Sequence, residues 1–394
     1  MTGTFSKHPR AFGFEDDLAV MSGNGAKVTL NDGNTYLDWV CGLGTNLLGY
    51  NDMRVITAVE RQLRNGVGFS LPNQLEYAVA EKLVNFLVSG GIVGWDKNNI
   101  SVRFAKTGTD GTAMAVRLAR AVTGKEPILS FGYHGWASEF SDTSPALGIP
   151  VGYQRDLIRK IKWNDKSSVM SAARREDFAA IIVEHPVDET DPDWYDFLRR
   201  ICDESKALLI LDEVVTGLRF GPGGAASLYN AMPDLIVMGK ALGNGVPISA
   251  LVGRKEYMDW FSRSDPVFCS STHWGEALGL AAASAVLDIW NQSAVEYIWS
   301  IGKMLMDGLA KSGYVVVGHP PRSLLKFDNK YDQAFFIHEM RERDILMNRP
   351  NFISTSHSQH SVKETVAAAN EVAQLREKTD PSYYKLPFVL FTGR

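Results

Sequence analysis

The chain has 394 residues, of which 45% are hydrophobic and 22% are charged, proportions typical of a globular protein and not of a disordered one. Its 41 lysine and arginine residues face 45 aspartate and glutamate residues, a net charge of -4, which argues against nucleic acid as the main partner. A chain of this length can bury a large core, and at about 150 residues per domain it is expected to form two or three domains.

The cysteines and the N-terminus lead us to expect a cytoplasmic protein. Cys41, Cys202 and Cys269 lie far apart and form no CxxC or Cys/His cluster, so we expect neither a disulfide framework nor a zinc site. The N-terminus lacks the basic start and apolar run of a signal peptide. The longest small and apolar stretch, residues 277–287, is too short to span a bilayer. We therefore expect no metal, no nucleic acid and no membrane partner.

The first hundred residues predict a hairpin followed by two helices. Residues 27–30 and 35–39 are β-prone and flank the turn Asn31-Asp32-Gly33-Asn34, in which Asp-Gly is a strong turn dipeptide. Apolar residues then recur at helical spacing in residues 52–65 and again in residues 75–88.

From residue 100 onward, short apolar strands alternate with helices. The expected strands are residues 102–105, 127–131, 180–184, 207–212, 235–238 and 249–252. Helices are expected between them, among them residues 109–122 and 194–204. Continuous apolar strands that alternate with helices are typical of a mostly parallel sheet covered on both faces, so we predict an α/β fold.

A long helix over residues 276–291 is expected to lead into a last domain. That part of the chain mixes elements at residues 295–312, 313–317 and 360–378. We predict a large domain over residues 51–285 and a small domain over residues 286–394, which residues 1–50 join.

Two polar sites follow predicted strands, at the sheet edge where α/β proteins bind ligands. Thr107-Gly108-Thr109 opens a helix and could hold a phosphate, but the motif alone favours an ordinary turn with Thr109 as the N-cap, because short turns of glycine and threonine are common. Asp212 directly follows five apolar residues, and a buried charge needs a partner. That partner could be the protonated ring nitrogen of a cofactor, or Asp212 could form a cap or a structural ion pair.

A lysine and an aromatic motif lie at the same kind of position. Lys240 is surrounded by apolar residues and glycines, which favours a nucleophilic amine able to form a Schiff base. The alternative is a surface lysine that packs its stem and exposes its charge. The aromatic rings in Tyr133-His134-Gly135-Trp136 could stack on a planar cofactor or simply pack, and a lone histidine such as His134 is more often structural.

Four stretches together resemble the class III, fold-type I family of pyridoxal 5′-phosphate (PLP) enzymes. They are residues 103–124, 132–135, 209–219 and 238–247. Within that family the chain is most similar to the glutamate-1-semialdehyde 2,1-aminomutases and related aminotransferases, and the 28-residue step from Asp212 to Lys240 matches. The resemblance implies a large domain with a mostly parallel sheet covered by helices. It also implies a smaller α+β domain built from the C-terminal and N-terminal segments.

The resemblance assigns roles around the cofactor ring. Lys240 would form the internal aldimine with PLP and later move a proton between the substrate α-carbon and the cofactor C4′ carbon. Asp212 would pair with the pyridine nitrogen and keep it protonated. Val214 would lie against one ring face and Tyr133 against the other, and His134, in the same motif as Tyr133, is expected in the cofactor site.

The resemblance also assigns the phosphate contacts. Gly108 and Thr109 would bind the phosphate through backbone and hydroxyl donors. Thr272 falls where the family donates a hydroxyl to the phosphate of the neighbouring subunit, which implies a homodimer with shared active sites. Glu184 matches a glutamate of the cofactor site on the strand beside Asp212, although His185 stands where the family usually has proline.

The substrate side departs further from the family. Arg10 lies in a segment that resembles one whose arginine binds the substrate carboxylate in the aminomutase, although it could also be a solvated N-terminal arginine. Arg349 stands where the aminomutase has a glutamate, and an arginine suits an anionic substrate group. The loop at residues 141–152 is shorter than the gating segment of the aminomutase, which would let a keto product leave.

These features favour an aminotransferase that exchanges an amino group between a small-molecule donor and a carbonyl acceptor by a ping-pong mechanism through a Lys240 aldimine. Arg349 and the short loop support this reading. Arg10 and the overall similarity favour the alternative, a glutamate-1-semialdehyde 2,1-aminomutase that transfers the amine within one molecule. A decarboxylase or racemase is less favoured. So is a PLP-fold protein without turnover, because it would not need Lys240 and Asp212 together.

Overall fold

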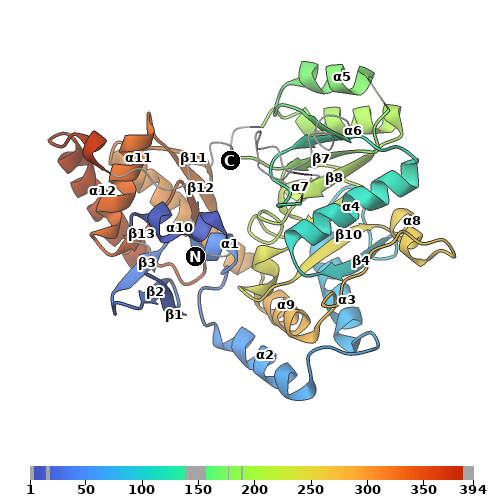
Figure 1. Ribbon diagram of the computed structural model, residues 1–394, viewed down its shortest axis with the longest axis horizontal. Coiled ribbons are helices and arrows are strands. Elements are labelled where there is room, and N and C mark those ends of the chain that lie inside the picture. Colours follow the sequence, from blue (N-terminus) through green and yellow to red (C-terminus); the bar gives the residue numbers. More distant parts are fainter. Residues whose placement is uncertain are drawn as a thin grey trace. The chain divides into compact units, whose positions relative to one another are not determined.

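The structure is a computed structural model that describes residues 4–14, 18–137, 140, 157–175, 177–187 and 190–384 (Figure 1). The chain divides into two compact units, Thr57–Trp290 and a second one made of Met1–Ile56 with Asn291–Arg394. The domain boundaries expected after residues 50 and 285 stay predictions. No helix in the described part of the chain is both long and apolar enough to cross a membrane.

The unit Thr57–Trp290 contains a seven-stranded sheet in the order β4-β10-β9-β8-β7-β5-β6. Its strands are β4 (Ile100–Ala105), β5 (Ile128–Phe131), β6 (Ile158–Lys160), β7 (Ala180–Glu184), β8 (Leu208–Asp212), β9 (Leu235–Met238) and β10 (Ser249–Arg254). The strand β10 is antiparallel to both of its neighbours, β4 and β9, and all the other neighbouring strands in this sheet pair in parallel. The predicted mostly parallel α/β sheet is therefore confirmed, and β4, β5, β7, β8 and β9 end at one edge.

Helices cover this sheet and bury residues on both of its faces. They include α3 (Gln74–Ser89), α4 (Gly108–Thr123), α5 (Lys166–Arg175), α6 (Trp194–Ser205), α7 (Gly224–Leu228), α8 (Lys255–Met258) and α9 (Ala277–Ile289). Figure 1 shows α4 alongside β10, and α4 is in contact with both β9 and β10. Every residue of β8 and β9 is buried, which explains why these strands are apolar without alternation, except at Asp212, the last residue of β8.

The start of α4 corrects one expectation. The N-cap is Thr107 and not Thr109, because the Thr107 hydroxyl accepts from the Asp110 backbone N–H while the Asp110 carboxylate accepts from the Thr107 N–H. Gly124, in the left-handed region at φ 69°, ends the helix. Thr109 therefore lies in the first turn, and its hydroxyl is not used by the cap.

The second unit contains two small sheets, in the orders β1-β2-β3-β13 and β11-β12-β14. Its strands are β1 (Val20–Asn24), β2 (Lys27–Leu30), β3 (Thr35–Asp38), β11 (Val315–His319), β12 (Arg322–Lys326), β13 (Ile345–Leu346) and β14 (Pro350–Phe352). The predicted hairpin is confirmed as β2 and β3. The N-terminal and C-terminal segments are joined where β13 pairs in parallel with β3, with Ile345 opposite Leu37.

In the second unit, α10 (Gln292–Lys311) contacts β11 and β12, α11 (Lys330–Arg341) contacts β13, and α12 (Gln359–Arg376) packs on α10 and α11. The helix α2 (Met53–Asn65) begins in this unit's part of the chain and ends in the other's. The turn α1 (Cys41–Gly44) has an unusual backbone, because φ is 50° at Cys41 and 64° at Leu43. Such left-handed angles are uncommon for residues other than glycine.

The contact between α10 and the loop before β12 requires glycine at position 302. A Cβ atom on Gly302 would overlap the carbonyl oxygen of Pro320. Gly302→Ala should therefore lower the free energy of unfolding by about 1–3 kcal/mol, the usual cost of overpacking, although alanine is the better helix former. Urea unfolding would measure this. Gly68→Ala is the matched control, because nothing lies within 4 Å of a Cβ there, and an equal loss in both variants would contradict the prediction.

Candidate active site

The centre of the site is Asp212, which is 4% exposed at the end of β8. Its Oδ2 lies 2.8 Å from Nδ1 of His134, and its Oδ1 accepts from the backbone N–H of Val214 at 3.1 Å. These contacts compensate the cost of burying a carboxylate. His134 is itself 2% exposed, and its Nε2 has no hydrogen-bond partner among the residues that the structure describes.

Lys240 lies on the neighbouring strand end. Asp212 is opposite Val237 in the parallel pair β8 and β9, and Lys240 follows three residues later, where it begins the short helix η4 (Lys240–Gly243). Gly239 is also adjacent to Val214, because a Cβ on Gly239 would lie 3.5 Å from Val214 Cγ1. The structure therefore brings the predicted catalytic lysine and carboxylate to the same edge of one sheet.

The backbone of Lys240 is in the left-handed region, with φ at 42°. A side chain other than glycine held there costs about 1–3 kcal/mol, and such strain is concentrated at functional sites. The lysine side chain is half-buried. An uncommon backbone at a half-buried amine supports a functional role over that of an ordinary surface lysine.

The predicted phosphate cup lies at the end of β4, where α4 begins. Backbone N–H groups in the first turn of a helix have no partner within the helix and attract anions. Gly108 packs closely on Val214, since a Cβ on Gly108 would lie 3.0 Å from Val214 Cγ1. Gly135, at φ 109°, packs against Thr109, whose Oγ1 a Cβ on Gly135 would overlap. The cup is therefore in contact with the segments that carry Val214 and Tyr133.

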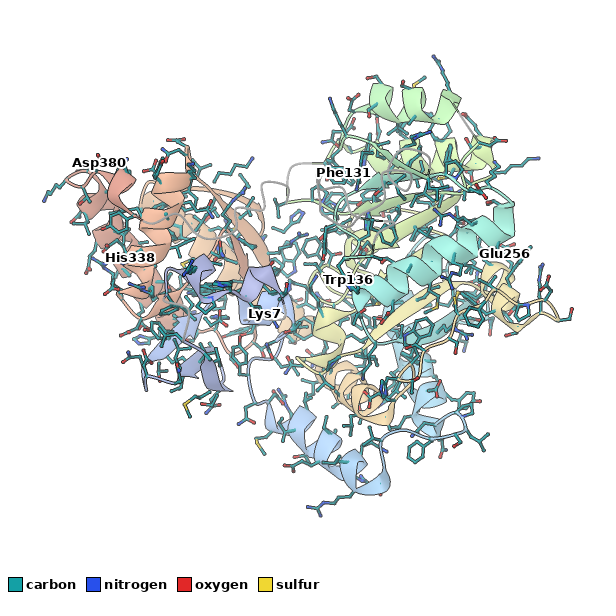
Figure 2. The ribbon with its side chains drawn as sticks, in the orientation of Figure 1. Lys7, Phe131, Trp136, Glu256, His338 and Asp380 are labelled. Carbon is teal, nitrogen blue, oxygen red and sulfur yellow. The ribbon has the colours of Figure 1, made fainter. Side chains whose placement is uncertain are left out.

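Tyr133 and Glu184 are joined directly. The backbone N–H of Tyr133 donates to Glu184 Oε2 at 3.1 Å, and Glu184 is opposite Asp212 in the pair β7 and β8. The Tyr133 side chain is 41% exposed, and Trp136, labelled in Figure 2, is 82% exposed. His185 is buried, with Nδ1 2.9 Å from the hydroxyl of Tyr195. His185, which stands where the family usually has proline, is therefore part of a cluster of aromatic side chains that includes Tyr195 and Tyr229.

The remaining predicted residues lie elsewhere. Thr272 is exposed, in a segment that precedes α9. Arg10 and Arg349 belong to the other unit. Arg10 is exposed within η2 (Pro9–Phe12), and Arg349 is half-buried just before β14. The predicted short loop at residues 141–152 lies outside the described residues.

These groups fit a planar cofactor that carries a phosphate. Asp212 offers a buried acceptor for a protonated ring nitrogen, and Gly108 and Gly135 let the cup pack closely against Val214 and Thr109, where a Cβ would be crowded. Lys240 offers an amine, and no set of metal-binding side chains occurs among the described residues. The donor set therefore suits an organic anion bound beside a lysine.

The sequence matches the family Aminotransferase class-III over residues 14–318. The chain belongs to this family. It is 34% identical over 325 residues to the glutamate-1-semialdehyde 2,1-aminomutase of Francisella philomiragia, covering 78% of this chain and 73% of that one. It is 30% identical to the enzyme of the same name from Methanothrix thermoacetophila, covering 86% and 85%. As a member of the class III aminotransferase family, the chain is an enzyme.

A solved structure supports the architecture of this class III aminotransferase. The FumI protein of Sphingopyxis sp. MTA144, in its PLP internal aldimine form, superposes with a TM-score of 0.85 at 26% identity. The match covers 98% of this chain and 95% of that protein. The predicted fold-type I architecture is therefore confirmed.

Sequence reasoning missed the role of Glu213 in this class III aminotransferase. Its side chain is 2% exposed and accepts hydrogen bonds from the backbone N–H groups of Ala225 at 3.1 Å and Ala226 at 2.7 Å, and from the hydroxyl of Thr216. Glu213 therefore fastens the loop after Asp212 to the start of α7. The signal in the sequence was a second acidic residue directly after an apolar strand.

Burial raises the pKa of Glu213 from its ordinary value near 4.5 to about 7. Between pH 4.5 and about pH 7, the Glu213 carboxyl is ionised in the unfolded chain but protonated in the folded chain. Its contribution to stability is therefore fully present below pH 4.5 and is lost as the pH rises through 7. Glu213→Gln cannot ionise. Its free energy of unfolding, relative to the wild type, should therefore increase from about pH 5 to about pH 8.

Urea unfolding at several pH values measures this difference. Glu81→Gln, at an exposed position on α3, is the control and should show no such trend. A Glu213→Gln difference that is constant with pH would mean that the carboxyl is ionised in the folded protein throughout.

Proposed function

We propose that this enzyme is a PLP-dependent aminotransferase that moves an amino group from a small-molecule amine or amino acid to a carbonyl acceptor by a ping-pong mechanism. The observation that carries the proposal is the placement of buried Asp212 and strained Lys240 at adjacent strand ends. The cofactor is pyridoxal 5′-phosphate, in keeping with the family and with the PLP form of the FumI protein.

Bound PLP supplies an electron sink for the negative charge that develops on the substrate carbon. Lys240 holds the cofactor through Nζ and then moves a proton between the substrate carbon and the cofactor. Asp212 accepts from the ring nitrogen and keeps it protonated. His134 positions that carboxylate through the 2.8 Å contact and so fixes the orientation of the acceptor oxygen.

The remaining cofactor residues position the ring and its phosphate. Val214, which packs against Gly108, would lie against one face of the ring, and Tyr133 would lie against the other. Gly108 and Thr109 bind the phosphate at the start of α4. Glu184 acts through the backbone of Tyr133, to which its carboxylate is bonded. The cup Gly108–Thr109, Tyr133, Glu184 and Val214 lie at the ends of four different strands of the same sheet, β4, β5, β7 and β8.

Arg349 favours transfer between two molecules. Its guanidinium has no hydrogen-bond or ion-pair partner among the residues that the structure describes, although the side chain is half-buried. A cation in that setting suits a carboxylate or another anionic group on the substrate. Arg10 is the second candidate for such a group. We infer an amino acid or keto acid as one of the two substrates.

The second candidate function is that of a glutamate-1-semialdehyde 2,1-aminomutase, which moves the amine within one molecule. The names of the curated relatives favour it, at 30% and 34% identity. Both functions require the same lysine, aspartate and phosphate cup. They differ in whether a carbonyl product leaves before the acceptor binds.

We further propose that the enzyme works as a cytoplasmic homodimer with shared sites. Thr272 is exposed on the chain that carries it, as expected for a hydroxyl that serves the phosphate of the neighbouring subunit. Donation across the interface would make cofactor affinity depend on assembly.

Lys240→Ala tests the mechanism directly. The variant should lose the visible absorption band of lysine-bound PLP and at least about 1,000-fold in turnover, because both the attachment and the proton transfer depend on this amine. Absorbance spectroscopy and single-donor assays without acceptor measure these effects. Wild-type protein that releases one carbonyl product per site is an aminotransferase. Repeated turnover of glutamate-1-semialdehyde without acceptor would instead identify the aminomutase, and unchanged turnover in the variant would exclude the mechanism.

Arg349→Gln tests the substrate side. The variant should raise KM for a carboxylate-bearing substrate by about 10- to 100-fold, with a smaller change for an amine without that group, because one charge-assisted contact is lost. Steady-state kinetics with such a pair of donors measure the split. Lys363→Gln, exposed on α12 of the same unit, controls for the lost charge. An equal rise in KM for both donors would assign Arg349 a structural role.

A further inference from the structure

The segment that carries Thr272 is held by basic side chains from β4 and α4. This segment, residues 268–276, lies between the short helix η5 (Asp259–Ser262) and α9 and has no strand or helix of its own. Arg117 Nη1 donates to the carbonyl of Phe268 at 2.7 Å, and Arg103 Nη2 donates to that of Cys269 at 3.3 Å. Strand β4 and helix α4 are also the elements that form the phosphate cup.

The C-terminal end of the segment is held by an ion pair between Lys106 and Glu276. Lys106 directly precedes the cup residues Thr107–Thr109, and the two side chains are 25% and 9% exposed. Glu276 also caps α9, accepting from the backbone N–H groups of Leu278 and Gly279 at 2.8 Å each. The pair therefore joins the cup to the end of the Thr272 segment.

The charge on Glu276 is secured by these contacts. Burial acts to raise its pKa, but the hydrogen bonds from Lys106 and from the backbone of Gly279 and Leu278 outweigh burial, so the pKa lies below its ordinary value. The carboxylate is therefore ionised at neutral pH. An ion pair that is largely withdrawn from water is screened less by salt than an exposed one.

Packing and polar contacts together hold the segment. Cys269 and Trp274 lie against the hydrophobic core of this unit. A cavity of about 410 Å³ also lies beside the segment, lined by Cys269, Ser270, Ser271 and Trp274 together with Arg103 and Glu76. The polar side-chain contacts therefore add to this packing, and the Lys106–Glu276 pair is the one adjacent to the cup.

We propose that the Lys106–Glu276 ion pair couples the two cofactor sites of the dimer. This inference rests on the proposed function, in which Thr272 serves the neighbouring subunit. A phosphate bound in the cup fixes the position of the backbone next to Lys106. Through its ion pair with Glu276, Lys106 then fixes the position of residues 268–276, whose Thr272 hydroxyl contacts the partner's cofactor. Binding that orders one site lowers the cost of ordering the other. Lys106 is thus a positioning residue that acts through Thr272.

The rate at which PLP leaves the purified dimer tests this proposal, followed by absorbance with excess apo-protein as a trap. Lys106→Met and Glu276→Gln should each release PLP about 5- to 10-fold faster, because both break the same contact. The two variants change the net charge near the phosphate in opposite directions. If Lys106 acted only through its charge on the phosphate, Glu276→Gln would slow release, and that result would overturn the proposal.

The double variant identifies the route. Thr272→Ala should speed release as well, and adding Lys106→Met to it should produce little further change, because both act through one contact. Multiplying effects would overturn the proposal. Lys82→Met is the matched control: Lys82 Nζ binds Asp288 Oδ2 at 2.6 Å near the other end of α9, and its loss should leave release unchanged.

Two further readouts separate the possible failures. The melting temperature of each apo-variant should remain close to the wild type, which excludes general unfolding as the cause of release. Wild-type protein that takes up no PLP would contradict the proposed function itself. Wild-type protein that retains PLP, with Lys106→Met and Glu276→Gln releasing it at the same rate as the wild type, would contradict only the coupling.

Discussion

The constraint on which this site depends is a carboxylate placed at the end of a wholly buried strand. Moving an ion out of water without partners costs more than the net stability of a typical domain. Asp212 is 4% exposed and is balanced by His134 and by the backbone of Val214. Those contacts require the segment after β5 to lie beside the end of β8. The position of the aromatic motif is therefore a consequence of the need to compensate one charge.

The two neighbouring acidic residues have opposite environments. Asp212 accepts from an imidazole at the sheet edge, whereas Glu213 turns into the protein and accepts from the start of α7. Burial raises the pKa of Glu213 to about 7, so its negative charge is weakened next to the carboxylate that we propose binds the cofactor. Glu213 itself fixes the loop that follows β8.

The sequence was sufficient wherever burial alone determines structure. Residues 180–184 were predicted as a strand from their apolar run, and β7 has those bounds. The same reasoning located Asp212 and Lys240, because strand ends are readable from hydrophobicity. The contact between Asp212 and His134 could not be predicted from the sequence, because the two residues are 78 positions apart and the contact depends on the strand order. For the same reason the two-residue strand β13 was missed: it exists only through its pairing with β3.

Some features could not follow from pattern at all. The ion pair between Lys106 and Glu276 spans 170 positions in the chain, and neither residue lies in a charge pattern that would indicate a partner. The positive φ angles at Cys41 and Leu43 are set by the tertiary packing of the second unit, because local preference alone disfavours them.

The backbone at Lys240 carries a consequence for how such a protein can change over generations. At φ 42° the conformation suits glycine best, while the proposed chemistry demands a side chain with an amine. Stability and activity thus prefer different amino acids at one position. In a lineage where turnover is no longer under selection, replacing Lys240 would make the fold more stable and abolish the reaction. Retention of lysine there is accordingly a mark of continued use, and its loss would be expected early in descendants kept only as scaffolds or binding proteins.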